Sequence, residues 1–312
     1  MVRIAVRLGH RNEWRRGSSR ATDMTGAAVA QRIFWQSAGP LLGRARGEMA
    51  RGIIECRWRM RRASTKAHGL PGALIVSLTS VPRRFRSLHY TLKCLLDQSV
   101  PADAVVLWLS EEDLGQLPAS VASLQAAGLS IRTAPDTGPY RKILPALEAF
   151  PGAYIATADD DAYYGRHWLE GLVREIRVGE RQIICHRAHG IRLNAQGIPL
   201  PYVQWEYELR RPEVSRRVFP TGVGGVLYPP GVFHGDVLNA GLYREICPTA
   251  DDLWLYWMAL RGGAVCRKVG LRRGMILWPG SQRVNLSQIN VMKHGNDRQI
   301  GNLIAHFGFP GL

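Results

Sequence analysis

Short apolar runs alternate with segments of helical spacing between residues 73 and 186, and this alternation constrains the fold more than any other feature. The apolar runs predict five buried strands: Ala73–Leu78, Ala104–Leu109, Leu129–Ala134, Ala153–Ala158 and Gln182–His186. The segments between them predict helices at Phe85–Leu96, Pro118–Ala127, Ile143–Ala149 and Trp168–Val178. Strands that are apolar along their whole length and alternate with helices predict an α/β fold with a mostly parallel sheet, covered on both faces.

The regular alternation ends near residue 187. Beyond this point Pro, Gly and aromatic residues become common, and only Asp252–Arg261 keeps clear helical spacing. A chain of 312 residues suits one large domain or two smaller ones. We expect the second half to pack on the first, which gives a basic extension over residues 1–70 and one domain over residues 71–312.

The net charge of +16 lies mainly in the N-terminal segment. Residues 1–70 contain 15 Lys and Arg against 4 Asp and Glu, whereas the remaining 242 residues contain 26 against 21. Three interpretations stay open: a solvated extension that is partly disordered or helical, adhesion to an anionic membrane surface through Trp14, Phe34 and Trp35 among the arginines, or translation from a later methionine. Nucleic-acid binding is disfavoured, because the charge beyond the extension is modest and no nucleic-acid motif occurs.

The sequence also bears on the cellular compartment. No stretch reaches the roughly 18 uncharged apolar residues of a membrane helix, and the arginine-rich N-terminus does not resemble a signal peptide. The five cysteines are scattered and form no CxxC motif, which favours a reducing environment. We therefore expect a cytoplasmic protein, with peripheral contact at the inner face of the cell membrane where the basic segment adheres.

Three consecutive aspartates, Asp159, Asp160 and Asp161, follow the fourth predicted strand. Ligands in open α/β sheets bind beyond the carboxyl ends of the strands. Mg²⁺ or Mn²⁺ suits oxygen ligands there and retains substrate phosphates in its coordination shell. In extended backbone Asp159 and Asp161 would point the same way and share a metal–diphosphate. The alternative is an acidic turn or a helix N-cap.

Basic and hydroxyl side chains stand on two further loops. The segment VSLTSVPRRF, at the end of the first strand, offers Thr79 and Arg83 where α/β sheets commonly seat a nucleotide. Arg141 and Lys142 precede a short predicted helix, where cations can hold phosphates. Basic loop residues alone usually face solvent, but together with the acidic triplet they indicate a nucleoside diphosphate site.

The later part of the chain adds an acidic pair. Asp251 and Asp252 begin a predicted helix, with Thr249 as a candidate N-cap. One interpretation is that the pair only favours the helix start. The other is a second carboxylate site, in which one carboxylate takes the proton of an acceptor hydroxyl as general base.

Two weaker candidates complete the set. Gly224 and Gly225, in TGVGGVLYPPG, mark either a structural turn or a tight loop where backbone approaches a ligand. His294, in KHGND, is either a surface histidine or a ligand that completes a metal shell.

In this order, the motifs resemble bacterial glycosyltransferases of the GT-A type, family 2-like, which are associated with capsule, exopolysaccharide or lipopolysaccharide assembly. The resemblance covers roughly Leu74 to Gly308 and rests on VSLTS-P-R, PY-K before LPAL, TADDD-YY, C-RAH, F-TGVGGVLYPP and CPTADD-WLYWM. It implies a GT-A fold, a nucleotide-sugar donor, and a saccharide or lipid-linked saccharide as acceptor.

The resemblance also implies roles for individual residues. Asp159 and Asp161 match the D-x-D motif that holds Mn²⁺ or Mg²⁺ on the donor diphosphate, with His294 as a further candidate ligand. The residues placed in the nucleotide-sugar site are Thr79, Arg83, Tyr140, Lys142, Asp160, Gly224 and Gly225. Asp252 is favoured over Asp251 as the base of an inverting reaction, although related sequences often have Glu-Asp where this chain has Asp-Asp. Residues 71–187 would then be the nucleotide-binding half and residues 188–312 the acceptor-binding half.

Two rival functions remain at this point. A sugar nucleotidyltransferase also combines an α/β sheet, a metal and a nucleotide, but it usually has a glycine-rich basic loop after the first strand, and SLTSVPRRF contains no glycine. The other rival is a nucleic-acid or membrane-surface binding protein that acts through the basic extension.

Overall fold

The computed structural model describes residues 26–62, 64–270, 275–281, 290 and 294–310. The chain divides into two units, residues 1–42 and residues 43–312. Helix α1 (Gly26–Arg59) begins in the first unit and ends in the second. Trp14 lies outside the described residues, whereas Phe34 and Trp35 lie within α1. No described helix is both long and apolar enough to cross a bilayer.

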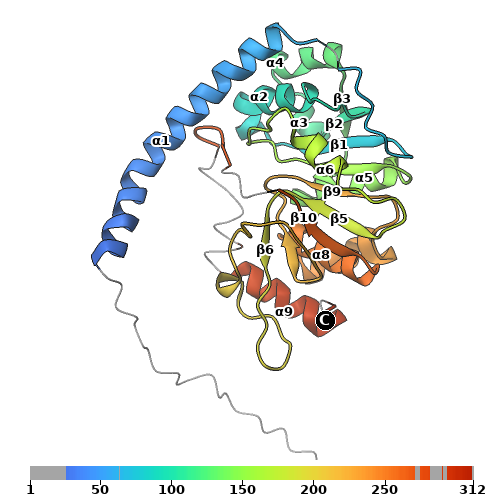
Figure 1. The fold of residues 1–312 in the computed structure, drawn as a ribbon. Helices are drawn as coiled ribbons and strands as arrows, with labels where there is room; N and C mark the ends of the chain where they lie inside the picture. Colours follow the sequence, from blue (N-terminus) through green and yellow to red (C-terminus); the bar gives the residue numbers. More distant parts are fainter. Residues whose placement is uncertain (1–25, 63, 271–274, 282–289, 291–293, 311–312) are drawn as a thin grey trace, which may run out of the picture. The chain divides into compact units, whose positions relative to one another are not determined.

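An eight-stranded sheet forms the centre of the second unit (Figure 1), in the order β3-β2-β1-β4-β9-β5-β10-β7. Its strands are β1 (Leu74–Thr79), β2 (Ala104–Leu109), β3 (Leu129–Thr133), β4 (Tyr154–Thr157), β5 (Gln182–Cys185), β7 (Glu213–Ser215), β9 (Val226–Tyr228) and β10 (Val265–Lys268). Pairs β1–β2, β2–β3, β1–β4 and β5–β10 are parallel, and β9 runs antiparallel between β4 and β5. Edge strand β7 is antiparallel to β10. The predicted α/β class with a mostly parallel sheet is confirmed.

Both faces of the sheet are buried, as the continuous apolar strands predict. Successive residues of β1 point to opposite sides, so that Leu74 and Val76 pack in one apolar cluster and Ile75 packs in the other. The first cluster includes side chains of α2 (Phe85–Leu96) and α6 (Trp168–Val173). The second includes α5 (Leu144–Ala149), α7 (Ala240–Ile246), α8 (Asp251–Arg261) and α9 (Gly295–Phe307).

Shorter elements connect the sheet and helices. The other helices among the described residues are α3 (Glu111–Leu114), α4 (Ala119–Ala122) and the 3₁₀ turns η1 (Pro82–Arg84), η2 (Ser123–Ala127), η3 (Gly138–Lys142), η4 (Tyr202–Gln204) and η5 (Gly235–Leu238). Strands β6 (Ala188–Gly190) and β8 (Val218–Pro220) form a separate antiparallel pair.

Several predicted bounds differ from the observed ones. The helix predicted over Pro118–Ala127 is split into α4 and η2, and α6 ends at Val173, five residues before the predicted end. Thr249 is not the N-cap of α8, because Ala250 occupies that position without a side-chain cap, while the Thr249 hydroxyl lies 2.7 Å from Asn290 Oδ1. Strands β9 and β10 and helices α7 and α9 had no clear sequence signal, since the strands have only three and four residues.

Candidate active site

The acidic triplet lies where β4 ends, at the carboxyl edge that β4 shares with its parallel neighbour β1. Asp160 and Asp161 stand in a turn and not in extended backbone, so the alternation expected of a strand does not apply to them. Asp159 Oδ1 lies 3.2 Å from Lys142 Nζ. Asp160 Oδ1 and Asp161 Oδ2 instead lie 2.5 Å and 3.3 Å from Arg84 Nη1. The triplet therefore faces two different cations.

Asp160 is the anchoring member of the triplet. Its buried carboxylate accepts hydrogen bonds from Ser80 Oγ at 2.5 Å and from Arg84 at 2.5 Å. Burial raises the pKa of Asp160 above its ordinary value, against the opposing effect of the Arg84 charge. The Thr91 hydroxyl lies 3.0 Å from the Asp160 carbonyl oxygen, and the Trp278 N–H donates to the Asp161 carbonyl at 2.9 Å. These contacts fix the backbone from which Asp159 and Asp161 project.

Lys142 is the centre of a second group of charges. It ends η3, and its Nζ lies 3.2 Å from Asp159 Oδ1 and 2.9 Å from Asp251 Oδ2. Ser77 Oγ of β1 donates to the Lys142 carbonyl at 2.6 Å and so holds the loop against the sheet. One buried ammonium thus joins the acidic triplet to the acidic pair at the start of α8.

Asp252 also belongs to this group of charges. Its Oδ2 accepts a hydrogen bond from the Gly222 N–H at 2.8 Å. Burial, followed by repulsion from Asp251, raises the pKa of Asp252 to about 7. Burial by itself lowers the pKa of Lys142. The negative charges of Asp159, Asp251 and Asp252 have a larger effect in the other direction, so the pKa of Lys142 is raised well above its ordinary value. The site therefore holds a permanent cation beside a carboxyl group that changes charge near neutral pH.

The loop residues predicted for the nucleotide site lie in unequal environments. Arg83 is exposed, while its neighbour Arg84 turns toward the triplet. Thr79 Oγ1 accepts a hydrogen bond from buried Arg141 Nε at 2.8 Å. Tyr140 is fully buried, stacks on Tyr243 with ring centroids 4.4 Å apart, and donates its hydroxyl to the Cys247 carbonyl.

The glycine pair and His294 lie outside this group of charges. The Gly224 carbonyl accepts a hydrogen bond from Trp168 Nε1 at 2.7 Å. A Cβ on Gly225, whose φ is 89°, would lie 2.4 Å from the Trp168 ring, so the Trp168 indole explains the need for glycine there. His294 has a side chain 73% exposed, and its Nδ1 lies 3.2 Å from Asp297 Oδ2. Within the described ranges, no group of three or more His, Cys, Asp or Glu side chains has the arrangement of a metal site.

Sequence reasoning missed Gly222, and it did not single out Arg84 and Arg141 from their basic neighbours. Arg84 and Arg141 were visible as basic residues beside Arg83 and Lys142, but one-dimensional spacing does not tell which member of a basic pair turns inward. Gly222 is the first glycine of TGVGG, and a Cβ there would lie 2.7 Å from both Asp252 Oδ1 and Lys142 Nζ. Only glycine fits where the backbone approaches charged side chains this closely. The presence of glycine at this position is therefore the sequence signal that could have identified it.

Aromatic side chains extend the site on the side of Asp252. His189 stacks on Tyr207 with ring centroids 4.3 Å apart, and the Arg187 guanidinium lies 5.3 Å from the same tyrosine ring. Arg187 Nη1 also donates to Thr221 Oγ1 at 2.9 Å, one residue before the glycine that binds Asp252. Tyr207 is 66% exposed. The exposed Tyr207 ring and the buried Asp252 carboxylate are thus linked through Arg187 and the chain segment that begins at Thr221.

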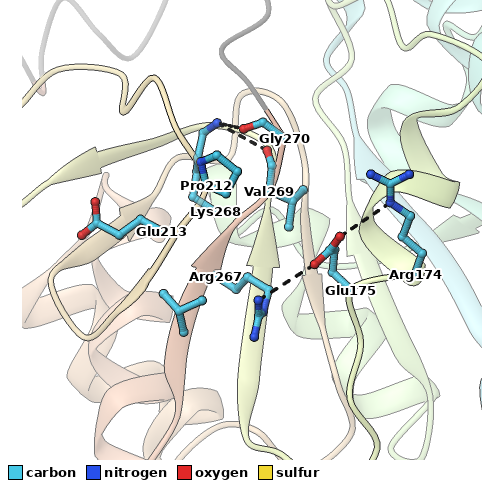
Figure 2. Close-up of a pocket in the computed structure, with 9 residues that line it drawn as sticks. Arg174, Glu175, Pro212, Glu213, Arg267, Lys268, Val269 and Gly270 are labelled. Atoms are coloured by element: carbon cyan, nitrogen blue, oxygen red, sulfur yellow. Dashed lines mark hydrogen bonds and ion pairs between the residues drawn. The ribbon is translucent and has the colours of Figure 1, made fainter.

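A separate hollow of about 300 Å³ lies between β7, β10 and the two residues that follow α6, and it includes none of the predicted site residues. Figure 2 shows Glu175 between Arg174 and Arg267, at 3.6 Å and 3.9 Å, and Lys268 turned toward backbone carbonyls. Burial lowers the pKa of Lys268. This hollow is therefore distinct from the group of charges around Lys142.

Neither a family model nor a curated protein matches the chain. Among solved structures, it is similar to the mannosyltransferase PcManGT from Pyrobaculum calidifontis in complex with GDP-Man and Mn²⁺, with 12% identity, TM-score 0.39, and coverage of 77% of this chain and 67% of that one. It is also similar to S. aureus TarS, with 14% identity, TM-score 0.39, and coverage of 65% and 59%. A third is Mycobacterium tuberculosis glucosyl-3-phosphoglycerate synthase with Mn²⁺, UDP and glucosyl-3-phosphoglycerate, at 11% identity, TM-score 0.41, and coverage of 80% and 87%. At these scores the activity has to be argued from the residues of the site.

Proposed function

We propose that the protein transfers a sugar from a nucleoside diphosphate sugar to a hydroxyl acceptor, with a divalent metal at the acidic triplet. The observation that carries the proposal is the position of the buried Asp252, which accepts a hydrogen bond from the Gly222 N–H beside the Asp159–Lys142–Asp251 group. Burial, which raises the pKa of Asp252 to about 7, supports its role. A general base works best when its pKa lies near the working pH. An ammonium and a metal at the carboxyl edge of the sheet suit a leaving diphosphate.

The charges around the triplet fit a hard divalent cation. The carboxylates of Asp159, Asp160, Asp161, Asp251 and Asp252 gather at this edge of the sheet, around Arg84 and Lys142. Oxygen donors of this kind suit Mn²⁺ or Mg²⁺, which retain waters and substrate phosphates. The Asp159 side chain is 19% exposed, against 4% for Asp160 and 6% for Asp161, so Asp159 is the member of the triplet that is most open to a ligand. Asp159 and Asp161 would hold the metal, and when bound the metal offsets charge that develops on the diphosphate.

The chain's own residues account for the rest of the reaction. Asp252 accepts the proton of the acceptor hydroxyl as that oxygen bonds to the anomeric carbon and the bond from this carbon to the diphosphate oxygen breaks. Attack opposite the leaving group inverts the configuration. Lys142 and Arg141 supply positive charge toward the donor, and Arg84 with Asp160 holds the turn in place. The exposed Tyr207 ring supports acceptor binding, because it offers a flat surface to a saccharide. We assign donor binding to residues 71–187 and acceptor binding to residues 188–312.

The sequence resemblance extends this proposal to surface polysaccharide assembly, with a saccharide or lipid-linked saccharide as acceptor. A sugar nucleotidyltransferase remains the enzymatic alternative. Incubation of a nucleotide sugar with a saccharide acceptor or with pyrophosphate separates the two reactions. A glycosyltransferase transfers the sugar to the acceptor and releases nucleoside diphosphate, whereas a nucleotidyltransferase converts the nucleotide sugar and pyrophosphate into nucleoside triphosphate and sugar 1-phosphate.

The donor site is tested by thermal shift with nucleoside diphosphates. We expect Mn²⁺ together with the preferred diphosphate to raise the melting temperature by a few degrees, since a ligand at 100 times its Kd stabilises by about 2.7 kcal/mol. Asp161→Asn should abolish this shift and retain the fold. Glu245→Gln, at an exposed side chain of α7, removes a carboxylate away from the site; it is the control and should keep the shift. An undiminished shift in folded Asp161→Asn would contradict the metal assignment.

Gly222→Ala tests the close approach of backbone to the charged group. The added methyl would lie 2.7 Å from Asp252 Oδ1 and Lys142 Nζ, so both side-chain ends must move. We expect kcat to fall by about 10²-fold, the effect of misplacing a catalytic group by about 1 Å, while the fold is kept. Gly301→Ala is the control, because Gly301 is exposed in α9 with no atom within 4 Å of the added methyl, and alanine should stabilise the helix slightly. Equal kcat values for the two variants would contradict the role of Gly222.

A further inference from the structure

The C-terminal part of α1 has two distinct faces, both within the second unit. Gly47, Ala50 and Ile54 are buried, and a Cβ on Gly47 would lie 2.7 Å from Pro279 Cδ, so small residues bring this face close to the body. Glu55 of the helix pairs with Lys93 at 2.5 Å. The helix is therefore attached through this face, and its other face is free to contact something else.

That other face carries an exposed apolar stripe, which we define as Met49, Ile53, Cys56 and Met60. The four residues follow the spacing i, i+4, i+7 and i+11, which places them along one side of a helix. Met49 is 62% exposed, Ile53 44% and Met60 68%. A continuous row of exposed apolar side chains of this kind marks an interaction site, whereas scattered ones do not.

A basic hollow adjoins the stripe at Met60. It has a volume of about 310 Å³ and is lined by Arg57, Met60, Arg61, Arg62, Asp97 and Arg166. Arg57 is paired with Asp97 at 2.6 Å, and the Arg61 guanidinium lies 4.1 Å from the Trp58 ring. Among the described residues no carboxylate lies within ion-pair distance of Arg61, Arg62 or Arg166. The hollow thus presents an excess of positive charge on the guanidinium groups of these three arginines, and guanidinium binds phosphate well.

We propose that this face of the protein docks on an anionic membrane surface, with a lipid phosphate in the basic hollow and the stripe among the acyl chains. Helices that lie in the membrane interface combine an apolar row with flanking arginines in this way. A second copy of the chain fits less well, because residues 43–62 contain seven arginines against Glu48 and Glu55, both already paired, and two such faces would repel. Nucleic acid would leave the apolar stripe without a partner. The proposal does not depend on the proposed enzymatic activity.

Cys56 provides a direct probe of the full-length protein. It is exposed, whereas Cys94, Cys185, Cys247 and Cys266 are buried, so a thiol-reactive, environment-sensitive fluorophore should label Cys56 selectively. We expect a blue shift of its emission on vesicles of phosphatidylcholine with phosphatidylglycerol, and none on phosphatidylcholine alone. The shift should weaken with salt, because screening reduces attraction to the surface. A label that stays in water on anionic vesicles would overturn the proposal.

Substitutions in the full chain separate this face from the basic residues 1–42. Arg62→Gln with Arg166→Gln should weaken vesicle binding about fivefold for each arginine removed, and Met49→Ser with Ile53→Ser should weaken it about tenfold. Arg210→Gln with Arg211→Gln removes the same charge from another exposed segment and should change binding much less. Circular dichroism checks that each variant folds, and the nucleotide thermal shift should be unchanged in all of them.

Four results would overturn the docking proposal. The first is equal vesicle binding by wild type and both test variants. The second is a change of oligomeric state in Met49→Ser with Ile53→Ser, without a change in vesicle binding, which would assign the stripe to a second copy. The third is binding of an RNA oligonucleotide, lost in Arg62→Gln with Arg166→Gln, by a protein that does not bind vesicles. The fourth is binding of soluble glycerol phosphate by a protein that does not bind vesicles, which would assign the hollow to a free phosphate and reject the membrane.

Discussion

Asp252→Asn is expected to lower the rate of glycosyl transfer by about 10²–10⁴-fold, the contribution of a general base, and at the same time to raise the melting temperature at pH 8. The carboxyl group is buried beside Asp251, and these surroundings raise its pKa to about 7. The folded protein therefore binds more protons than the unfolded chain between about pH 4, the ordinary pKa of an aspartate, and pH 7. Stability falls as pH rises through this window, and asparagine removes that loss while its oxygen can still accept from Gly222.

Melting curves and rates as a function of pH check this prediction. Wild-type kcat/KM should rise with pH through about 7 as Asp252 loses its proton, and the stabilising effect of asparagine should be present at pH 8 and absent at pH 4. Asp236→Asn is the control, because its effect on stability at pH 8 should have the opposite sign. The hydrogen bond from Arg261 lowers the pKa of Asp236, so its removal should destabilise the protein at pH 8. Full activity of folded Asp252→Asn would exclude Asp252 as the base.

Lys142→Met is expected to destabilise the protein by about 3–5 kcal/mol, the cost of removing one partner from a buried ion pair. The variant leaves Asp159 and Asp251 without the ammonium that lies 3.2 Å and 2.9 Å from their oxygens. Two unpaired carboxylates at this depth prefer the protonated form. Urea unfolding should therefore show a deficit at pH 8 that shrinks toward pH 5.

Two further variants make this measurement specific. Asp251→Asn in the Lys142→Met background should recover part of the lost stability, because it removes one of the stranded charges. Lys66→Met removes a lysine whose pair with Glu170 is at the surface, with the lysine side chain 59% exposed, and should cost at most about 1 kcal/mol. If Lys142→Met unfolds at the same urea concentration as Lys66→Met, the charges around Lys142 do not stabilise the fold as described.

The strands of the first half were predictable because burial on both faces demands continuous apolar residues. The predicted Ala104–Leu109 strand has the observed bounds, and the triplet was correctly placed beyond a strand end. Strand β9 was not predictable, since three residues give no periodicity and its pairing partners lie about 40 and 70 residues earlier in the chain. The sheet is completed by contacts that sequence spacing does not encode.

Side-chain directions within the site were harder to predict than its location. The alternation rule for strands was applied to Asp159 and Asp161, but the chain turns there, so Asp161 shares Arg84 with Asp160. Arg84 and Arg83 look equivalent in the sequence, and only the geometry of η1 and α2 turns one inward. The link between Lys142 and Asp251 joins residues more than a hundred positions apart, and only the folded chain reveals it.

The position of β9 has a consequence for synthesis of the protein on the ribosome. Strands β1 to β4 can pair as soon as they emerge, but β5 has no neighbour in the sheet until β9 and β10 follow. Until residue 228 has left the ribosome, β4 presents an open apolar edge, which is a template for pairing with other chains. Nascent chains that pause between β5 and β9 should therefore be those that chaperones bind most, since long-range strand pairing delays folding.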